Sequence, residues 1–255
     1  MWDSRSYPGV RGDGYGGRVS QPAIKGVAEY LNVVWAIKSP SHAVMKLYRG
    51  QSEAHPLLPR LFRHPNEASR VKRVEPTLLR NFKTDSPFLL PSKPSNEWDW
   101  LSLGQHFGLP TRLLDWSANP LTALFFAVES ADAKSPTVYI YQCKKSQIVS
   151  PVDRKSSPYH IEKTRIFQPS WHSVRVAMQA GWHTVHHIYE KKGKETFRPL
   201  QDMKFHDERT SEISIDPGHA SHLRAELAEM GIKHGTIYGD LQSVCASIQT
   251  SLGIP

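Results

Sequence analysis

Cysteine is scarce in this sequence, with two residues among 255. Cys143 and Cys245 lie far apart and lack the close spacing of a metal-binding or redox pair. A fold held together by several disulfides is therefore excluded. Two isolated thiols are typical of a reducing compartment, so we predict a cytoplasmic protein.

Long hydrophobic runs are also missing. The longest candidate, Leu121 to Val128, has the length of a core helix and is too short to cross a bilayer. The N-terminus lacks a charged stretch followed by an apolar segment, which argues against a signal peptide. We therefore expect no membrane partner.

Several familiar site motifs are absent as well. The sequence contains neither a Gly-rich phosphate loop nor a Ser nucleophile elbow. His183, His186 and His187 suggest a metal site, but no Glu stands beside the first His and no Cys lies nearby. In a strand, His183 and His187 would face one way and His186 the other. We therefore predict no metal ion.

The composition is that of an ordinary globular protein. Hydrophobic residues make up 39% of the chain and charged residues 22%, and the length allows one substantial core. The net charge of +8 favours an anionic small molecule or nucleic acid as partner. The basic residues are spread along the chain, however, so a solvated basic surface is the simpler explanation. The oligomeric state is left open.

The hydrophobic pattern predicts a mixed α/β or α+β fold, a small sheet flanked by helices in a single domain over residues 21–255. Residues 1–20, rich in Gly, Arg, Ser and Tyr, are predicted to be a flexible leader. The predicted helices are 21–38, 67–82, 96–107, 119–128, 216–230 and one from 240, and the predicted strands are 44–48, 137–142, part of 174–189, 211–215 and 235–238. Exposed or irregular connections are predicted at 52–66, 84–96, 143–170 and 190–209.

Helix faces and ends follow from the same pattern. Asn119 and Pro120 are typical of a helix start, and Gly231 of a helix end. Residues expected to face the core are Val27, Tyr30, Leu31, Val34 and Trp35 of the first helix, Leu223, Leu227 and Met230 of the helix before Gly231, and Leu241, Val244 and Ile248 of the last helix.

Residues 105–116 hold the densest group of reactive side chains, in the order Gln-His-Phe-Gly-Leu-Pro-Thr-Arg-Leu-Leu-Asp-Trp. We expect a turn between two helices, where Gly108 caps the first helix and Pro110 prevents its continuation. His106, near that helix end, could act as an acid or a base because its ordinary pKa is close to neutrality.

The polar residues that follow admit two interpretations. Arg112 could hold an anion, and Thr111 could contact a ligand or cap a turn. Asp115 could pair with Arg112, orient His106 or hold Arg49. The alternative is a buried polar network that pins the junction between two core helices.

A second polar group lies at Tyr48-Arg49-Gly50-Gln51, where a strand is predicted to end. Arg49 can present its planar guanidinium to a phosphate or carboxylate, and Gly50 would let a ligand approach the backbone. A salt bridge from Arg49 to a core carboxylate is the structural alternative. Arg175 and Gln179 would share one face of a helical turn before Gly181.

Taken in order, these residues resemble the FRG domain family of bacteria and their viruses, which is named for an aromatic-Arg-Gly motif such as Tyr48-Arg49-Gly50. The strongest similarity is Gln105 to Trp116, continued by Asn119-Pro120 and residues 123–127. Weaker similarities are Pro59-Arg60, Glu75 with Phe82, Gln179-Ala180-Gly181 and residues 227–248, so that the resemblance spans about 25–250. Phe107, in place of the commoner Tyr, and Trp182-His183 depart from the family pattern.

The resemblance implies a role in conflict between bacteria and phages and leaves the reaction open. One hypothesis is a nucleotide-using transferase similar to the ADP-ribosyltransferases in fold and activity. In that superfamily a strand-end Arg-Gly or His-Gly holds NAD, as Arg49 would here with NAD as substrate. The oxocarbenium-like transition state also needs a carboxylate, for which Glu75, Glu208 and Glu212 are candidates.

Two other hypotheses remain open. A non-enzymatic module could bind a nucleotide or nucleic acid through Arg49, Arg60 and Arg112. A hydrolase of phosphodiester or glycosidic bonds could use His106 and Asp115. The predicted catalytic residues are His106, Asp115 and Glu75, and the predicted ligand-binding residues are Tyr48, Arg49, Gly50, Gln51, Arg60, Gln105, Thr111, Arg112 and Gln179.

Overall fold

The structure is a computed structural model that describes residues 23–63, 68–170, 174–202 and 209–252. Its strands are β1 (Ala43–Gln51), β2 (Leu113–Ser117), β3 (Thr137–Lys144), β4 (Arg165–Phe167), β5 (Gly181–Val185), β6 (Tyr189–Lys191), β7 (Lys194–Thr196) and β8 (Arg209–Ser214). Its α-helices are α1 (Val27–Ala36), α2 (Ala68–Asp85), α3 (Glu97–His106), α4 (Pro120–Val128), α5 (Val174–Met178), α6 (Ala220–Glu229), α7 (His234–Tyr238) and α8 (Leu241–Ser251). The predicted leader, residues 1–20, lies outside the described ranges.

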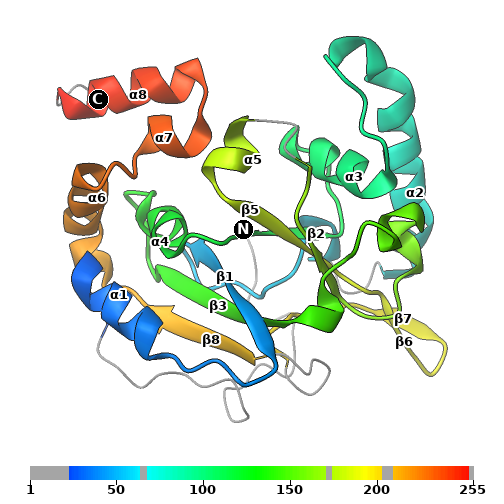
Figure 1. The fold of residues 1–255 in the computed structure, drawn as a ribbon, viewed down its shortest axis with the longest axis horizontal. Helices are drawn as coiled ribbons and strands as arrows, with labels where there is room; N and C mark the ends of the chain where they lie inside the picture. The colour runs from blue at the N-terminus through cyan, green and yellow to red at the C-terminus, as the bar shows by residue number, and fades with distance from the viewer. Residues whose placement is uncertain (1–22, 64–67, 171–173, 203–208, 253–255) are drawn as a thin grey trace.

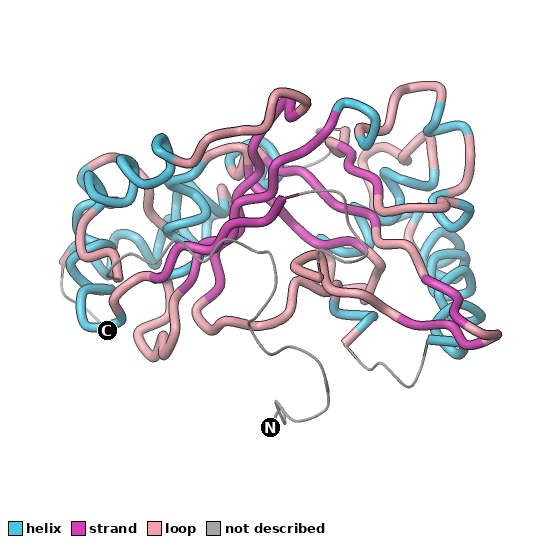
Figure 2. Tube along the Cα trace, turned by 90° about the horizontal axis from the view of Figure 1, so that it is seen from below, coloured by secondary structure: helices cyan, strands magenta, loops and turns pink. Residues whose placement is uncertain are grey.

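Six strands form one antiparallel sheet in the order β4-β5-β2-β1-β3-β8, and β6 and β7 form a separate hairpin (Figure 1). Helices gather at two ends of the molecule, and the strands cross between them (Figure 2). The predicted mixed α+β architecture is confirmed. Within the described ranges, no helix is both long and apolar enough to cross a membrane.

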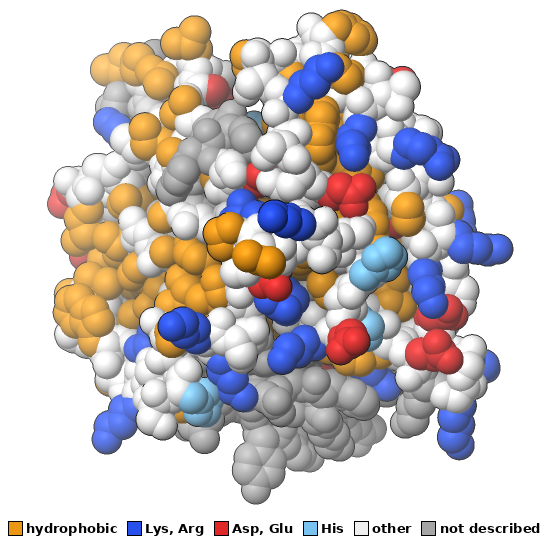
Figure 3. All heavy atoms as spheres, turned by 45° about the vertical axis from the view of Figure 1, so that its right-hand side comes forward, with side chains coloured by type: hydrophobic (Ala, Val, Ile, Leu, Met, Phe, Trp, Pro, Cys, Tyr) orange, Lys and Arg blue, Asp and Glu red, His pale blue; other side chains and the backbone are white. Residues whose placement is uncertain are grey.

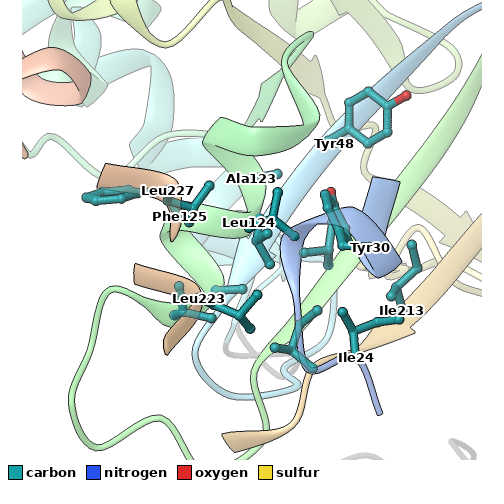
Figure 4. Close-up of a cluster of buried hydrophobic side chains, with 14 of the residues drawn as sticks. Ile24, Tyr30, Tyr48, Ala123, Leu124, Phe125, Ile213, Leu223 and Leu227 are labelled. Atoms are coloured by element: carbon teal, nitrogen blue, oxygen red, sulfur yellow. The ribbon is translucent and has the colours of Figure 1, made fainter. Parts of the chain in front are cut away.

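One face of the sheet half formed by β1, β3 and β8 is covered by α1, α4 and α6. Tyr30 of α1, Leu124 of α4 and Leu223 of α6 meet there in one buried cluster with Ile213 of β8 (Figure 4). α4 is apolar on nearly every side because it lies against both the sheet and α6. The core position expected of a helix of this length is confirmed.

The other half of the sheet has its own helix layer. Trp98 and Leu101 of α3 pack against Leu113 of β2 and Phe167 of β4. α2 lies beside α3 and packs with Phe62 in a smaller apolar cluster.

The opposite face of the sheet is covered by irregular segments. Leu57 and Leu200 are fully buried there against Trp116 of β2. The prediction that residues 52–66 and 190–209 are exposed connections is therefore wrong for their apolar positions. Single leucines from loops have no helical or strand period, so a periodicity argument does not detect them.

β1 and β2 diverge after a short contact. They pair only at Tyr48 and Ser117, whereas β1 pairs with β3 from Ala43 to Gln51. β2 in turn pairs with β5 along its whole length. The sheet therefore consists of two well-paired halves that are joined at one point.

Three of the predicted helix ends are confirmed, at Asn119-Pro120, Gly108 and Gly231. α4 begins at Pro120, and the side chain of Asn119 accepts a hydrogen bond from the Leu121 N–H at 2.9 Å. Gly108 follows α3 with a φ of 91°, and Gly231 follows α6 with a φ of 81°. Both angles are in the left-handed region that favours glycine at a helix end.

Two predicted elements are wrong. α1 begins at Val27 rather than at Gln21, because Ile24 is extended and forms a parallel bridge with Ile215. Residues 235–238 belong to helix α7 rather than to a strand. α7 is a short helix of five residues, and Gly239, with a φ of 67°, ends it. A segment this short is too brief for its sequence pattern to distinguish a helix from a strand.

The turn in residues 105–116 also differs from the prediction. Its second half forms strand β2, where a direct connection between two helices was expected. Two leucines and a tryptophan within five residues fit either a buried strand or a helix start, and the pairing with β5 decides the conformation. The residues predicted to face the core but found exposed are Trp35, Met230, Leu241, Val244 and Ile248.

A buried ion pair joins α2 to β2. Arg112 is 3% exposed, and its Nε and Nη2 donate to both carboxylate oxygens of Glu75 over 2.7–3.0 Å. The Arg112 backbone N–H donates to the same carboxylate. Its guanidinium lies 4.9 Å from the ring centre of Tyr159, and Nη1 approaches the carbonyls of Pro158 and His186. The Arg112 guanidinium therefore links α2, the start of β2 and the two loops that contain Pro158 and His186.

We predict strong coupling between these two charges. Arg112→Met or Glu75→Leu leaves one buried charge unpaired and should each lower the free energy of unfolding by about 3–5 kcal/mol. The double variant should lose clearly less than the sum, because it leaves neither charge unpaired. Urea unfolding measures all three variants, and additive losses would contradict the coupling. Lys72→Met is the control, since solvent screens the exposed Lys72–Glu195 pair and its loss should change stability little.

Gly50 provides a second stability test. A Cβ at this position would lie 1.8 Å from the Ala123 carbonyl oxygen and 2.6 Å from the Ala127 nitrogen of α4. Backbone atoms cannot yield as a flexible side chain does, so Gly50→Ala should lower the free energy of unfolding by at least about 3 kcal/mol. Gly26→Ala is the matched control, because its Cβ would meet Glu226 at an ordinary 3.7 Å. Equal unfolding midpoints for the two variants would refute this packing.

Candidate functional site

Two connected hollows lie where β1 and β2 diverge. The main hollow has a volume of about 340 Å³ and is lined by the end of β1, by β2 and by side chains of α4 and α5. The side hollow, of about 110 Å³, lies between α3, α5 and β5. Asp115, Trp116, Arg175 and Gln179 line both hollows.

The structure brings most of the predicted site residues together here. Those that line the main hollow are Tyr48, Arg49, Gly50, Gln51, Asp115 and Gln179, and those that line the side hollow are Gln105, His106, Asp115 and Gln179. Thr111, Arg112, Glu75 and the exposed Arg60 line neither. Glu75 is 1% exposed and both its oxygens bind Arg112, which leaves it no access to a ligand.

Arg49 spans the gap between the diverging strands. Its Nη1 donates to the backbone carbonyl of Asp115 at 2.8 Å. Its Nε is buried and has no hydrogen-bond partner among the described residues. Burial lowers the pKa of the Arg49 guanidinium, the Asp115 charge raises it and the nearby Arg63 lowers it. A half-buried cation with a spare donor is suited to an anionic ligand.

Further cations surround the main hollow. Arg63 and Arg175 line it together with Arg49. The Arg175 guanidinium lies 4.6 Å from the ring centre of Tyr238, so α7 helps to hold it in place. Glu53 lies at the same hollow, 3.4 Å from His55. Three guanidinium groups against two carboxylates, Asp115 and Glu53, favour an anion.

Asp115 is the carboxylate that both hollows share. Its side chain is 63% exposed, and its Oδ1 accepts a hydrogen bond from Gln105, which in turn accepts one from Thr111. His183 Nδ1 lies 3.1 Å from the same oxygen. Desolvation by the surrounding protein acts to raise the pKa of Asp115, but His183, Arg49 and Gln105 outweigh it and hold that pKa below its ordinary value. The carboxylate is therefore ionised at neutral pH.

His106 lies at the side hollow. Burial and the charge of Arg175 lower its pKa, while Asp115 acts in the opposite direction. The imidazole is therefore uncharged at neutral pH, as a general base must be. Phe107 is 67% exposed, and its ring centre lies 4.9 Å from that of His106.

The turn before β5 presents Gln179 to both hollows. Ala180 has a φ of 45°, a conformation that costs a non-glycine residue about 1 kcal/mol or more. Hydrogen bonds from Ala118 N–H to Ala180 and from Ser117 Oγ to the Gln179 carbonyl hold the turn. The side-chain nitrogen of Gln179 is buried without a partner among the described residues, so it offers a second unused donor.

Gly50 and Gln51 shape the site rather than offer free groups. Position 50 needs a glycine because α4 packs so closely that its backbone would clash with a Cβ. From the sequence, this glycine was attributed to the close approach of a ligand. The side-chain oxygen of Gln51 accepts the His55 N–H at 3.1 Å and so fixes the chain where it leaves β1.

Sequence reasoning missed Ser102 and Arg63 and considered His183 only as a metal ligand. His183 faces Asp115 and Ser102, while His186 contacts Thr184 Oγ1 at 3.0 Å. Among the described residues, no three His, Cys, Asp or Glu side chains converge on a metal position. The predicted alternation correctly placed His183 and His186 on opposite faces of the segment that contains β5. The sequence did not reveal that β5 pairs with β2, which brings His183 to Asp115.

Basic side chains are visible over much of one face of the molecule (Figure 3). On the face shown in Figure 3, Lys and Arg side chains are scattered, with Asp and Glu side chains between them.

The electrostatics of the site can be tested at His106. Arg175→Gln removes a cation and should raise the pKa of His106, whereas Asp115→Asn removes an anion and should lower it. Imidazole resonances followed by NMR between pH 4 and 9 measure both shifts, with His106→Gln to assign the signal. A pKa that moves in the same direction in both variants would contradict this arrangement.

Comparison with known families is consistent with the motifs. Residues 45–135 match the FRG domain family, a shorter range than the residues 25–250 over which the resemblance was traced. The matched range includes Arg49 and Asp115, whereas Arg175 and His183 lie beyond it. No curated protein and no solved structure matches the chain. The chain therefore carries an FRG domain, over residues 45–135.

Proposed function

We propose that the two hollows bind a nucleotide such as NAD and that the protein cleaves or transfers its ribosyl group. The observation that carries this proposal is the placement of three arginines around the ionised Asp115. Guanidinium groups bind phosphate oxygens in pairs of charge-assisted hydrogen bonds. A pyrophosphate would therefore be held in the main hollow, beside a carboxylate.

Asp115 has the properties that ribosyl transfer requires. Cleavage of an N-glycosidic bond develops positive charge on the sugar, and a fixed carboxylate stabilises that transition state. Asp115 lies at the boundary of the main and side hollows, so the sugar would sit between a phosphate site and a smaller leaving-group site. Trp182 and the uncharged His106 at the side hollow suit a heterocyclic leaving group.

The other candidate carboxylates support this choice. Glu75 is engaged by Arg112, and Glu212 of β8 lines neither hollow. Glu208 lies outside the described residues. Arg49 lies near the end of β1, two residues before its last residue, Gln51, and this position resembles the strand-end arginine with which ADP-ribosyltransferases hold NAD. A similar fold and a role in conflict with phages form part of this proposal.

NAD turnover provides the decisive test. We expect the purified full chain to release nicotinamide from NAD, with Asp115→Asn lowering the rate at least about 100-fold because the transition-state charge loses its partner. Arg49→Gln should weaken NAD binding about tenfold or more through loss of a charged hydrogen bond. Arg80→Gln, on the exposed side of α2, is the charge-matched control and should leave both quantities unchanged.

The remaining outcomes identify a different function. Saturable nucleotide binding with a steep salt dependence and no turnover would indicate a binding module, which the excess of arginines also supports. Cleavage of RNA or DNA that disappears in His106→Gln, with NAD intact, would indicate a hydrolase. A bound nucleotide at 100 times its Kd should stabilise the fold by about 2.7 kcal/mol, so absence of any thermal shift would overturn nucleotide binding altogether.

A further inference from the structure

The side chains behind Asp115 form a linear array. The imidazole of His183 has Nδ1 3.1 Å from Asp115 Oδ1 and Nε2 2.8 Å from Ser102 Oγ. The ring centre of His183 lies 5.2 Å from that of the fully buried Phe167, which restricts its rotation. α3, β5 and β2 each supply one member of this array.

The array contains the Ser, His and Asp of a serine-hydrolase triad, but here the serine is buried and the aspartate is exposed. Ser102 is 6% exposed and lies inside α3, where the backbone N–H groups are used by the helix. A nucleophile needs access to substrate and also free donors for an oxyanion; Ser102 borders the side hollow, but the backbone N–H groups around it in α3 are not free to serve as such donors. The exposed member is Asp115, so the working end of the array is the carboxylate.

We infer that His183 and Ser102 act as positioning residues that hold Asp115 ionised and aim its second oxygen at the ligand. A neutral imidazole can serve both neighbours only if Nδ1 carries the proton and Nε2 accepts the Ser102 hydroxyl. Oδ1 is then engaged by Gln105 and His183. Among the described residues, no hydrogen bond reaches Oδ2, which leaves this oxygen for the ligand.

The contact between His183 and Asp115 is short but imperfectly aligned. Nδ1 is buried and lacks an aligned acceptor among the described residues, although Oδ1 is only 3.1 Å away. Hydrogen bonds of this kind often tighten when a ligand binds. A small rotation of the Asp115 carboxylate toward a positively charged sugar would complete the bond. The role of His183 and Ser102 in turnover rests on the proposed function, whereas their support of the Asp115 carboxylate does not.

Two substitutions of His183 separate hydrogen bonding from packing. His183→Leu removes the donor to Asp115, and His183→Asn keeps an N–H near the position of Nδ1. We expect the pKa of Asp115, followed by carboxyl carbon NMR on the full chain, to rise in His183→Leu and to return toward the native value in His183→Asn. His187→Leu is the control, because that imidazole binds the Ile161 carbonyl.

An unchanged Asp115 pKa in a folded His183→Leu variant would overturn the inference, as would equal pKa values in the Leu and Asn variants. Should His183→Leu not fold, the Asn variant and Ser102→Ala carry the test. Ser102→Ala should release the fixed Nδ1–H tautomer of His183, seen in imidazole nitrogen shifts, and an unchanged tautomer would exclude Ser102 from the array.

The same variants distinguish this inference from the proposed function. If the chain releases nicotinamide, the acid limb of the pH–rate profile should move to higher pH in His183→Leu and recover in His183→Asn. If the pKa of Asp115 changes as expected but no nucleotide binds, the array stands and the proposed function fails. If nicotinamide is released with the same acid limb in all variants, the function stands and the array is refuted.

Discussion

The divergence of β1 from β2 is the constraint on which the site depends. Antiparallel neighbours that remain paired saturate each other's backbone groups and leave no room between them. Here pairing is limited to Tyr48 and Ser117, and the Arg49 side chain donates across the gap to the Asp115 carbonyl. One long cationic side chain thus satisfies a backbone group and carries a positive charge to the Asp115 carboxylate. The hollow and its electrostatics have the same origin.

The motif in residues 105–116 serves the core and the hollow through neighbouring side chains. Alternation along β2 directs Leu114 and Trp116 to the apolar cluster under the sheet and leaves Asp115 on the other face. Arg112, just before the strand, is neutralised by Glu75 of α2. Because the Glu75 carboxylate balances the buried charge of Arg112, Asp115 is not needed to neutralise that charge. Of the alternatives open from the sequence, a buried network therefore describes Arg112, while Asp115 remains available to a ligand.

The features that could be predicted from the sequence depend on residues that are adjacent in the chain, whereas the features that were missed depend on residues far apart in it. The start of α4 at Asn119-Pro120 and the end of α3 at Gly108 depend on adjacent residues, and both were predicted correctly. The clustering of Arg49 with Asp115 was among the predicted alternatives, because the motif limited the partners. The contact of His183 with Asp115 was not predictable, since it depends on the register between β2 and β5, which local periodicity does not encode. The side chain of Leu200 is buried for a similar reason, through a loop that crosses the sheet.

The extent of the family match explains why it leaves the reaction open. Residues 45–135 include most of β1 and all of β2 but end before α5 and β5, so the matched range lacks the strand that pairs along all of β2. It also lacks Arg175 and His183, which set the charge around His106 and Asp115. The match therefore does not cover the elements that complete the two hollows. Identification of the ligand consequently requires the full chain rather than the matched range.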